Sequence, residues 1–290
     1  MAVIRKIEIL TTVHEMYKRF TTIAGKTIIV RKTDSARIKT ETQKRKPKTN
    51  PTPEAVAKIN KINQERELTA KINGNFKAGD LWVTLSHPEG VDIETSMKEI
   101  KKFKNNIRNM AKRNGVKYKM IESTGIGEQK GKAHHHIVIS KEITREMIIK
   151  YWPEEYVHIE TLWSSGNYHR VAKYMLKNAY QSKGERGKHS KAYRSTKNII
   201  MPVTKVEEMK RPASYDPEDI APHDGYAVDR DSIRVYEHPI TGVPCIEYIE
   251  VSLTEDPKIK KYKKGKIARK EKSYKEYWGE QLSIMDKLQI

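Results

Sequence analysis

Residues 118–140, YKMIESTGIGEQKGKAHHHIVIS, decide the fold of this chain. Two runs of β-favouring residues flank the polar, glycine-rich segment 125–131, and this order is typical of a β-hairpin. Side chains two apart on a strand share a face. His134 and His136 therefore point the same way, and His135 points the other way. The sequence predicts a rigid hairpin with two imidazoles on one face.

The pairing of the two strands decides which carboxylate joins these histidines. We expect a turn symmetric about Glu128, which pairs position 122 with position 134 and puts Glu122 on the face of both histidines. Glu122, His134 and His136 would then suit a divalent cation, Mg²⁺ or Mn²⁺, that keeps positions open for substrate oxygens. Glu128 is the competing third ligand. The alternative interpretation is that the histidines are structural or decorate the surface.

A second motif follows in residues 167–181, NYHRVAKYMLKNAYQ, which are predicted to form a helix. A spacing of three places Tyr174 and Lys177 on one face of that helix. Tyrosine can act as a nucleophile, but its ordinary pKa of about 10 leaves it protonated at neutral pH. A bound cation and Lys177 would favour the ionised phenol and stabilise charge on an attacked phosphate. The pattern therefore indicates covalent catalysis by Tyr174.

With these motifs in this order, the chain resembles the HUH endonucleases, specifically the rolling-circle replication initiators of small phages and plasmids. The resemblance covers roughly residues 76–203 and includes GDLWVTLSH at 79–87, which is similar to the family's first strand motif. Five residues match the family's functional positions, namely the metal ligands Glu122, His134 and His136, the nucleophile Tyr174 and its partner Lys177.

Two positions depart from the family pattern. His135 stands where the family usually has a hydrophobic residue, and Arg170 stands where two-tyrosine members have a second nucleophile. The resemblance thus implies a single-tyrosine enzyme that nicks and religates single-stranded origin DNA through a 5′-phosphotyrosine. A single-tyrosine transposase is usually much shorter, and relaxases carry their tyrosine before the histidines. From another class, a non-catalytic nucleic-acid-binding protein is the alternative.

Composition favours a nucleic-acid partner. The 290 residues carry a formal net charge of +20, and neutralisation of phosphates by Lys and Arg drives binding to nucleic acid. No run of about 18 apolar residues occurs and the N-terminus lacks signal-peptide features, so we expect no membrane and a cytoplasmic location. Cys245 is the single cysteine, which excludes a disulfide framework. No G-x-x-x-x-G-K-[ST] loop is present, so any helicase must be recruited from the host replication machinery.

The order of elements predicts the fold class. The expected elements are a helix at 56–73, a strand at 81–86, an amphipathic helix that begins near Thr95 or Ser96 and has the apolar stripe Met97, Ile100, Phe103, Ile107 and Met110, the hairpin, a short helix at 144–152, a strand at 156–163 and the tyrosine helix. This is a β-α-β-β-α-β order followed by a helix. We therefore predict an α+β fold, a split βαβ (ferredoxin/RRM-like) antiparallel sheet with helices packed on it.

Charge and composition divide the chain further. We predict a small β addition with a basic arm at 1–50, a leading helix at 51–75, the nuclease domain at 76–203, a linker and β-hairpin at 204–254 and a basic tail at 255–290. Residues 1–50 hold 13 Lys or Arg against 4 Asp or Glu, and residues 258–275 hold 10 against one. We expect the arm, 37–48, to contact the DNA backbone.

Further residues are assigned to DNA binding because basic side chains and an interleaved aromatic suit single-stranded DNA. They are Arg170, Lys173, Lys188, Lys191, Tyr193 and Arg194. A plain basic loop is the alternative for the segment beyond the tyrosine helix. At the C-terminus, QLSIM at 281–285 resembles the peptide with which bacterial polymerases dock on the sliding clamp. Gln281, Leu282 and Met285 would be its anchors, and a short amphipathic turn folded onto the domain is the alternative.

Overall fold

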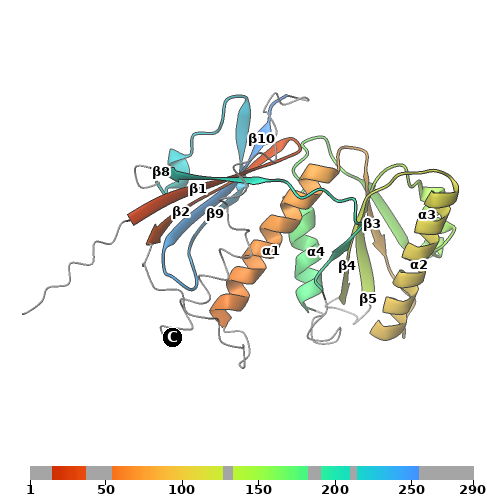
Figure 1. Cartoon of the computed structure of the whole chain (residues 1–290). Helices are drawn as coiled ribbons and strands as arrows, with labels where there is room; N and C mark the ends of the chain where they lie inside the picture. The colour runs from red at the N-terminus through yellow and green to blue at the C-terminus, as the bar shows by residue number, and fades with distance from the viewer. Residues whose placement is uncertain (1–14, 37–53, 127–132, 182–190, 210–213, 255–290) are drawn as a thin grey trace, which may run out of the picture.

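The computed structural model describes residues 15–36, 54–126, 133–181, 191–209 and 214–254. In these residues the chain forms an α+β fold with two antiparallel five-stranded sheets and four α-helices (Figure 1). Several sequence predictions lie outside the described residues, namely the β-like run 3–10, the arm 37–48, Glu128, Lys188, the basic run 258–275 and the peptide 281–285.

The first sheet is the one that the hairpin predicted. Its strand order is β6-β3-β5-β4-β7, and all neighbours are antiparallel. The strands are β3 (Leu81–Leu85), β4 (Met120–Ile126), β5 (Ala133–Ile139), β6 (Val157–Thr161) and β7 (Arg194–Ser195). Helix α2 (Ile93–Arg113) follows β3, and α3 (Arg145–Ile149) with a 3-10 turn (Glu154–Tyr156) precedes β6. This arrangement confirms the split βαβ fold.

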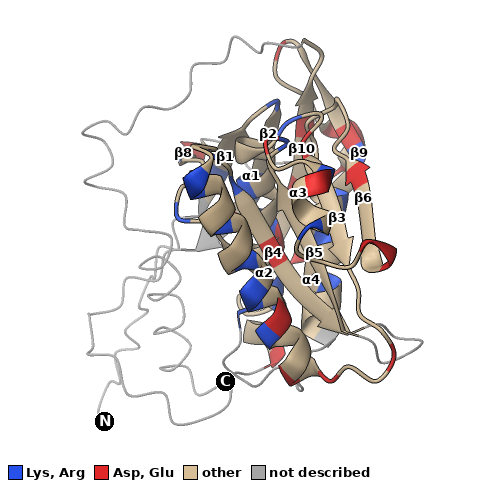
Figure 2. Cartoon of the chain, turned by 90° about the vertical axis from the view of Figure 1, so that its right-hand side faces the viewer, with Lys and Arg blue, Asp and Glu red and all other residues tan. Residues whose placement is uncertain are grey.

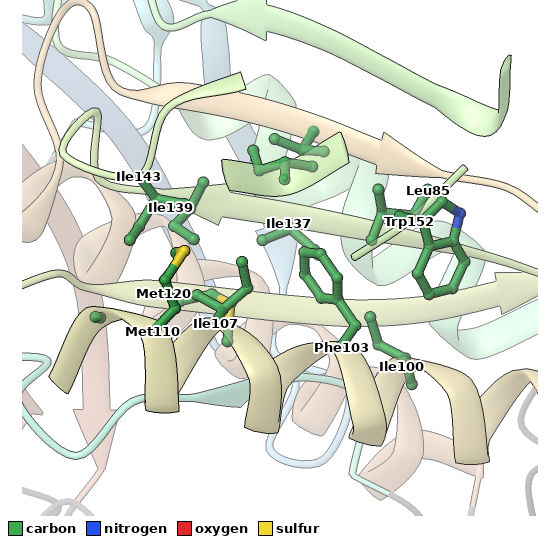
Figure 3. Close-up of a cluster of buried hydrophobic side chains, with 13 residues drawn as sticks. Leu85, Ile100, Phe103, Ile107, Met110, Met120, Ile137, Ile139, Ile143 and Trp152 are labelled. Atoms are coloured by element: carbon green, nitrogen blue, oxygen red, sulfur yellow. The ribbon is translucent and has the colours of Figure 1, made fainter. Parts of the chain in front are cut away.

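Helix α2 covers one face of this sheet, as its apolar stripe predicts. Ile100, Phe103, Ile107 and Met110 are buried against strand residues that include Ile137 (Figure 3). Its N-cap is Asp92, whose side chain accepts a hydrogen bond from Thr95 N at 2.8 Å. The helix thus begins before the Thr95 or Ser96 start that the sequence indicated. Lysines and arginines mark the length of α2 in Figure 2.

Helices α1 (Glu54–Asn75) and α4 (His169–Gln181) cover the opposite face of the first sheet. Leu68 and Ile72 of α1 pack with Met175 of α4 and with Val138 of β5. Layers therefore enclose the sheet on both sides, α2 on one and α4 with α1 on the other. The hairpin strands β4 and β5 lie at the centre of the packing.

The second sheet unites both ends of the described chain. Its order is β8-β1-β2-β10-β9, from β1 (Glu15–Ala24), β2 (Thr27–Ala36), β8 (Thr204–Met209), β9 (Tyr226–Glu237) and β10 (Pro244–Ser252), with a 3-10 turn at Pro217–Asp219. The sequence interpretation kept residues 1–50 and 204–254 apart. Strands β2 and β10 instead pair directly, Val30 opposite Tyr248, because a hairpin alone cannot bury a face.

Helix α1 lies between the two sheets (Figure 1). Its Ala70 packs on Ile29 and Ile249 of the second sheet, while its Leu68 faces the first. Helices in the described residues include no segment with the length and hydropathy that crossing a bilayer requires.

Candidate active site

The register of the hairpin differs from the sequence prediction. Gly125 pairs with His134, and Glu122 pairs with Ile137. The pairing symmetric about Glu128 is therefore wrong. Glu122 lies opposite a residue an odd number of positions from the expected one, and such a shift moves a side chain to the other face of the sheet.

Glu122 is consequently not a ligand of the histidine pair. Its side chain lies on the face that α2 covers, is 2 % exposed and forms an ion pair with Lys104 of α2. Arg194 Nη1 of β7 is 3.7 Å from the same carboxylate oxygen. The carboxylate that the sequence assigned to a cation thus belongs to a buried ion pair on the far side of the sheet.

His134 and His136 share the face that α4 covers, which confirms the alternation predicted for the strand. Their ring centroids are 4.7 Å apart. The ring of Tyr174 lies 4.9 Å from that of His136, and Trp82 of β3 stacks on His136 at 5.5 Å. Tyrosine and histidines, distant in sequence, therefore meet on one side of β5.

The hydrogen bonds of His136 fix its ring. Thr84 Oγ1 lies 3.1 Å from Nδ1, and Asn178 Nδ2 lies 3.4 Å from Nε2. Burial, followed by the proximity of His134, lowers the pKa of His136 to about 3. His136 is therefore a neutral imidazole at pH 7, which is the form that binds metal ions.

His135 points into the α2 face, where the sequence placed it, but its surroundings were not foreseen. It is fully buried, with Nδ1 2.8 Å from Thr124 Oγ1 and Nε2 3.0 Å from Ser96 Oγ. Nε2 of His87 lies 3.1 Å from Nε2 of His135. Burial, more than neighbouring charge, keeps the pKa of His135 well below its ordinary value. The unusual residue of the triplet is thus part of a buried polar network.

Three tyrosines near or on α4 have different surroundings. Tyr174 is 50 % exposed. Tyr168 donates its hydroxyl to Trp163 O at 3.1 Å, and Tyr180 donates to Gln64 Oε1 at 2.6 Å. Burial raises the pKa of Tyr168 and of Tyr180 to about 12. Of the three, Tyr174 is the one that an incoming phosphate can reach.

The exposed stripe of α4 surrounds Tyr174 with cations. Arg170, Lys173 and Lys177 are exposed on the same helix, and Arg170 pairs with the exposed Asp231 of β9. The spacing puts these side chains within one turn of Tyr174 on either side. The predicted DNA-binding residues of this helix therefore accompany the predicted nucleophile.

The residues beyond α4 are arranged differently from the prediction. Tyr193 packs against the core under α4, and its hydroxyl lies 3.0 Å from Glu67 Oε1 and from Lys71 Nζ. This position does not favour stacking of its ring on a base. Arg194 lies near Glu122 on the α2 face, away from Tyr174, whereas Lys191 is exposed.

The histidine pair offers two donors for a cation. In the described residues, no three side chains of His, Cys, Asp or Glu come together as a metal site. His158 and Glu160 of β6 share the face of His136, through Thr84 and Trp82 of the intervening strand. Two strand spacings amount to roughly 10 Å, so they do not complete the site. The two neutral imidazoles nevertheless fit a divalent cation with open positions.

The central part of the chain is similar to a known protein family. Residues 80–179 match the family model of the replication-associated protein ORF2. The match begins before β3 and ends within α4, so it includes the histidine pair and Tyr174 but neither α1 nor the second sheet. Searches of curated proteins and of solved structures gave no significant match. The similarity to the ORF2 family associates this part of the chain with DNA replication.

Proposed function

We propose that the protein is a single-tyrosine, cation-dependent DNA nickase that starts rolling-circle replication. The position of Tyr174 carries the proposal: its ring is exposed and lies 4.9 Å from His136 on the face of the histidine pair. The similarity of residues 80–179 to the ORF2 family supports a replication role for this site.

In the proposed reaction, Tyr174 Oη attacks a backbone phosphate of single-stranded DNA. The Oη–P bond forms as the phenolic proton leaves, the P–O3′ bond breaks, and the 3′ oxygen takes up a proton. The DNA then has a 5′ phosphate linked to Tyr174 and a free 3′ hydroxyl that can prime synthesis. Attack of a 3′ hydroxyl on the phosphotyrosine reverses these steps and religates the strand.

The chain's own side chains prepare this reaction. A divalent cation held by His134 and His136 would stabilise charge on the attacked phosphate. Thr84 fixes the ring of His136 through Nδ1, so that Nε2 is the nitrogen directed into the site. Lys177, one turn from Tyr174, and the exposed Lys173 would attract and orient the phosphate backbone.

The proposed partners are single-stranded DNA at a replication origin and the host machinery that extends the 3′ end. The decisive experiment incubates the full chain with Mn²⁺ and a pool of single-stranded oligonucleotides of random sequence. We expect an adduct that resists SDS, and sequencing of the linked DNA should give a common 5′ end.

The controls follow from the three tyrosines. Tyr174→Phe should abolish the adduct while DNA binding stays within a few-fold. Tyr180→Phe should retain it, because that hydroxyl is engaged with Gln64. An adduct that persists in Tyr174→Phe, or DNA binding without any adduct in the wild type, would contradict the proposal; the latter result fits a non-catalytic DNA-binding protein.

A further inference from the structure

We propose that Asn178 is the third protein ligand of the cation, through its amide oxygen Oδ1. The inference rests on the proposed function, since it concerns the same cation as His134 and His136. It gives α4 a second role beside that of carrying Tyr174.

The site needs a donor that the strands do not provide. Glu122 lies on the other face of the sheet with Lys104, and within the described ranges no His, Cys, Asp or Glu completes a group of three. The donor must therefore come from another residue type or another element. Helix α4 is the element that packs on this face of β4 and β5.

Asn178 is the α4 residue closest to the metal-binding atom of His136. Its amide nitrogen lies 3.4 Å from Nε2, and its side chain is 8 % exposed. Thr84 occupies the other ring nitrogen. The amide group of Asn178 thus sits where the neutral imidazole presents its free lone pair.

A glycine makes this approach possible. A Cβ atom at Gly125 would lie only 2.6 Å from Cβ of Asn178, closer than two carbons can pack. Gly125 is paired directly with His134. The missing side chain therefore lets Asn178 lie over the strand beside both members of the histidine pair.

The chemistry of the amide suits either state of the site. Without a cation, Nδ2–H of Asn178 faces the lone pair of His136 Nε2. A half-turn of the amide exchanges Nδ2 for Oδ1 at the same place. Amide oxygens are ordinary ligands of Mg²⁺, Mn²⁺ and Ca²⁺. Binding of the cation would then replace a weak hydrogen bond by two ligand bonds.

The position of Asn178 links the cation to the nucleophile. Asn178 follows Tyr174 by one helical turn, and its Nδ2 donates to Tyr174 O at 3.1 Å. A ligand bond from Asn178 would hold α4 against β5 at the turn next to Tyr174. Cation binding would therefore fix the nucleophile as well as polarise the phosphate.

The test measures Mn²⁺ affinity of the full chain without DNA, from the electron paramagnetic resonance signal of free Mn²⁺. Asn178→Ala should weaken binding by about tenfold or more. Asn178→Asp, which keeps the shape and adds a charge, should bind at least as tightly as the wild type. Glu122→Gln is the matched control on the opposite face and should leave the affinity unchanged.

The outcomes separate this inference from the proposed function. Wild-type affinity in Asn178→Ala, or weakened affinity in Asn178→Asp, overturns the Asn178 assignment while the histidine site stands. A loss on Glu128→Ala with none on Asn178→Ala would assign the third ligand to Glu128. If His134→Ala with His136→Ala also binds Mn²⁺ normally, the cation site of the proposed function itself is wrong. Thermal denaturation shows whether each variant is folded, and the Asp variant decides if the Ala variant is not.

Discussion

The carboxylate of Glu122 and the imidazole of His136 lie on opposite faces of the same sheet. Glu122 contacts Lys104 of α2, whereas His136 contacts Tyr174 of α4. One face of the hairpin is therefore structural and the other carries the proposed chemistry. Substitutions on the two faces should separate stability from cation binding.

Glu122→Ala should lower the free energy of unfolding without changing Mn²⁺ affinity. The carboxylate is buried and paired, and its loss leaves Lys104, which is partly exposed, without that partner. We expect a loss of about 1–3 kcal/mol. Urea denaturation measures it, and a double-mutant cycle with Lys104→Ala isolates the pair. Weaker Mn²⁺ binding in this variant would contradict the separation of the two faces.

His135→Ala should destabilise the protein while the folded fraction still nicks DNA. His135 is fully buried, and its loss leaves the hydroxyls of Thr124 and Ser96 without a partner they now have. The expected cost is about 2–4 kcal/mol. His134→Ala is the opposite case, with little change in stability and loss of Mn²⁺ binding. Equal effects of the two variants on Mn²⁺ affinity would refute this distinction.

Gly125→Ala should weaken both stability and Mn²⁺ binding, because the new Cβ would lie 2.6 Å from Cβ of Asn178 and push α4 away. Overpacking of this kind costs about 1–3 kcal/mol. Ser123→Ala on the same strand is the control, since its buried hydroxyl finds no hydrogen-bond partner among the described residues. That variant should be neutral or slightly stabilising. Differential scanning calorimetry compares the two.

Acid should destabilise the fold through His238. Burial, aided by Arg31 and Arg66, lowers the pKa of His238 to about 4, while an unfolded histidine titrates near 6.5. Its contribution to stability is complete above about pH 6.5 and is lost as the pH falls towards 4, on the order of 2–3 kcal/mol in total. His238→Gln should flatten this slope. His158→Gln, at an exposed position, should not, and an equal slope in both would reject the assignment.

Lys173→Ala should weaken binding to single-stranded DNA about equally for all sequences. If Lys173 contacts a phosphate, its loss reduces the slope of log affinity against log salt by roughly 0.7. Lys112→Ala, on the outer surface of α2, should leave that slope unchanged. Fluorescence anisotropy at several salt concentrations gives the slopes. The reverse result would place the DNA on α2 instead of along α4.

The sequence by itself determined the features that depend on local periodicity. Alternation along a strand separates His135 from His134 and His136, and the apolar stripe of residues 97–110 fixes which side of α2 is buried. The order of strands and helices is enough to predict the split βαβ sheet. These signals are local because each arises from the geometry of one helix or one strand.

Only the tertiary structure decided the partners of those elements. The turn between β4 and β5 does not set the register, because the packing of both sheet faces against α2 and α4 selects it, and this register moved Glu122 to the structural face. The same long-range packing exposes Tyr174 and buries Tyr180, and it brings Asn178 over Gly125. Contacts between residues far apart in sequence leave no periodic pattern, so they appear only once the chain is folded.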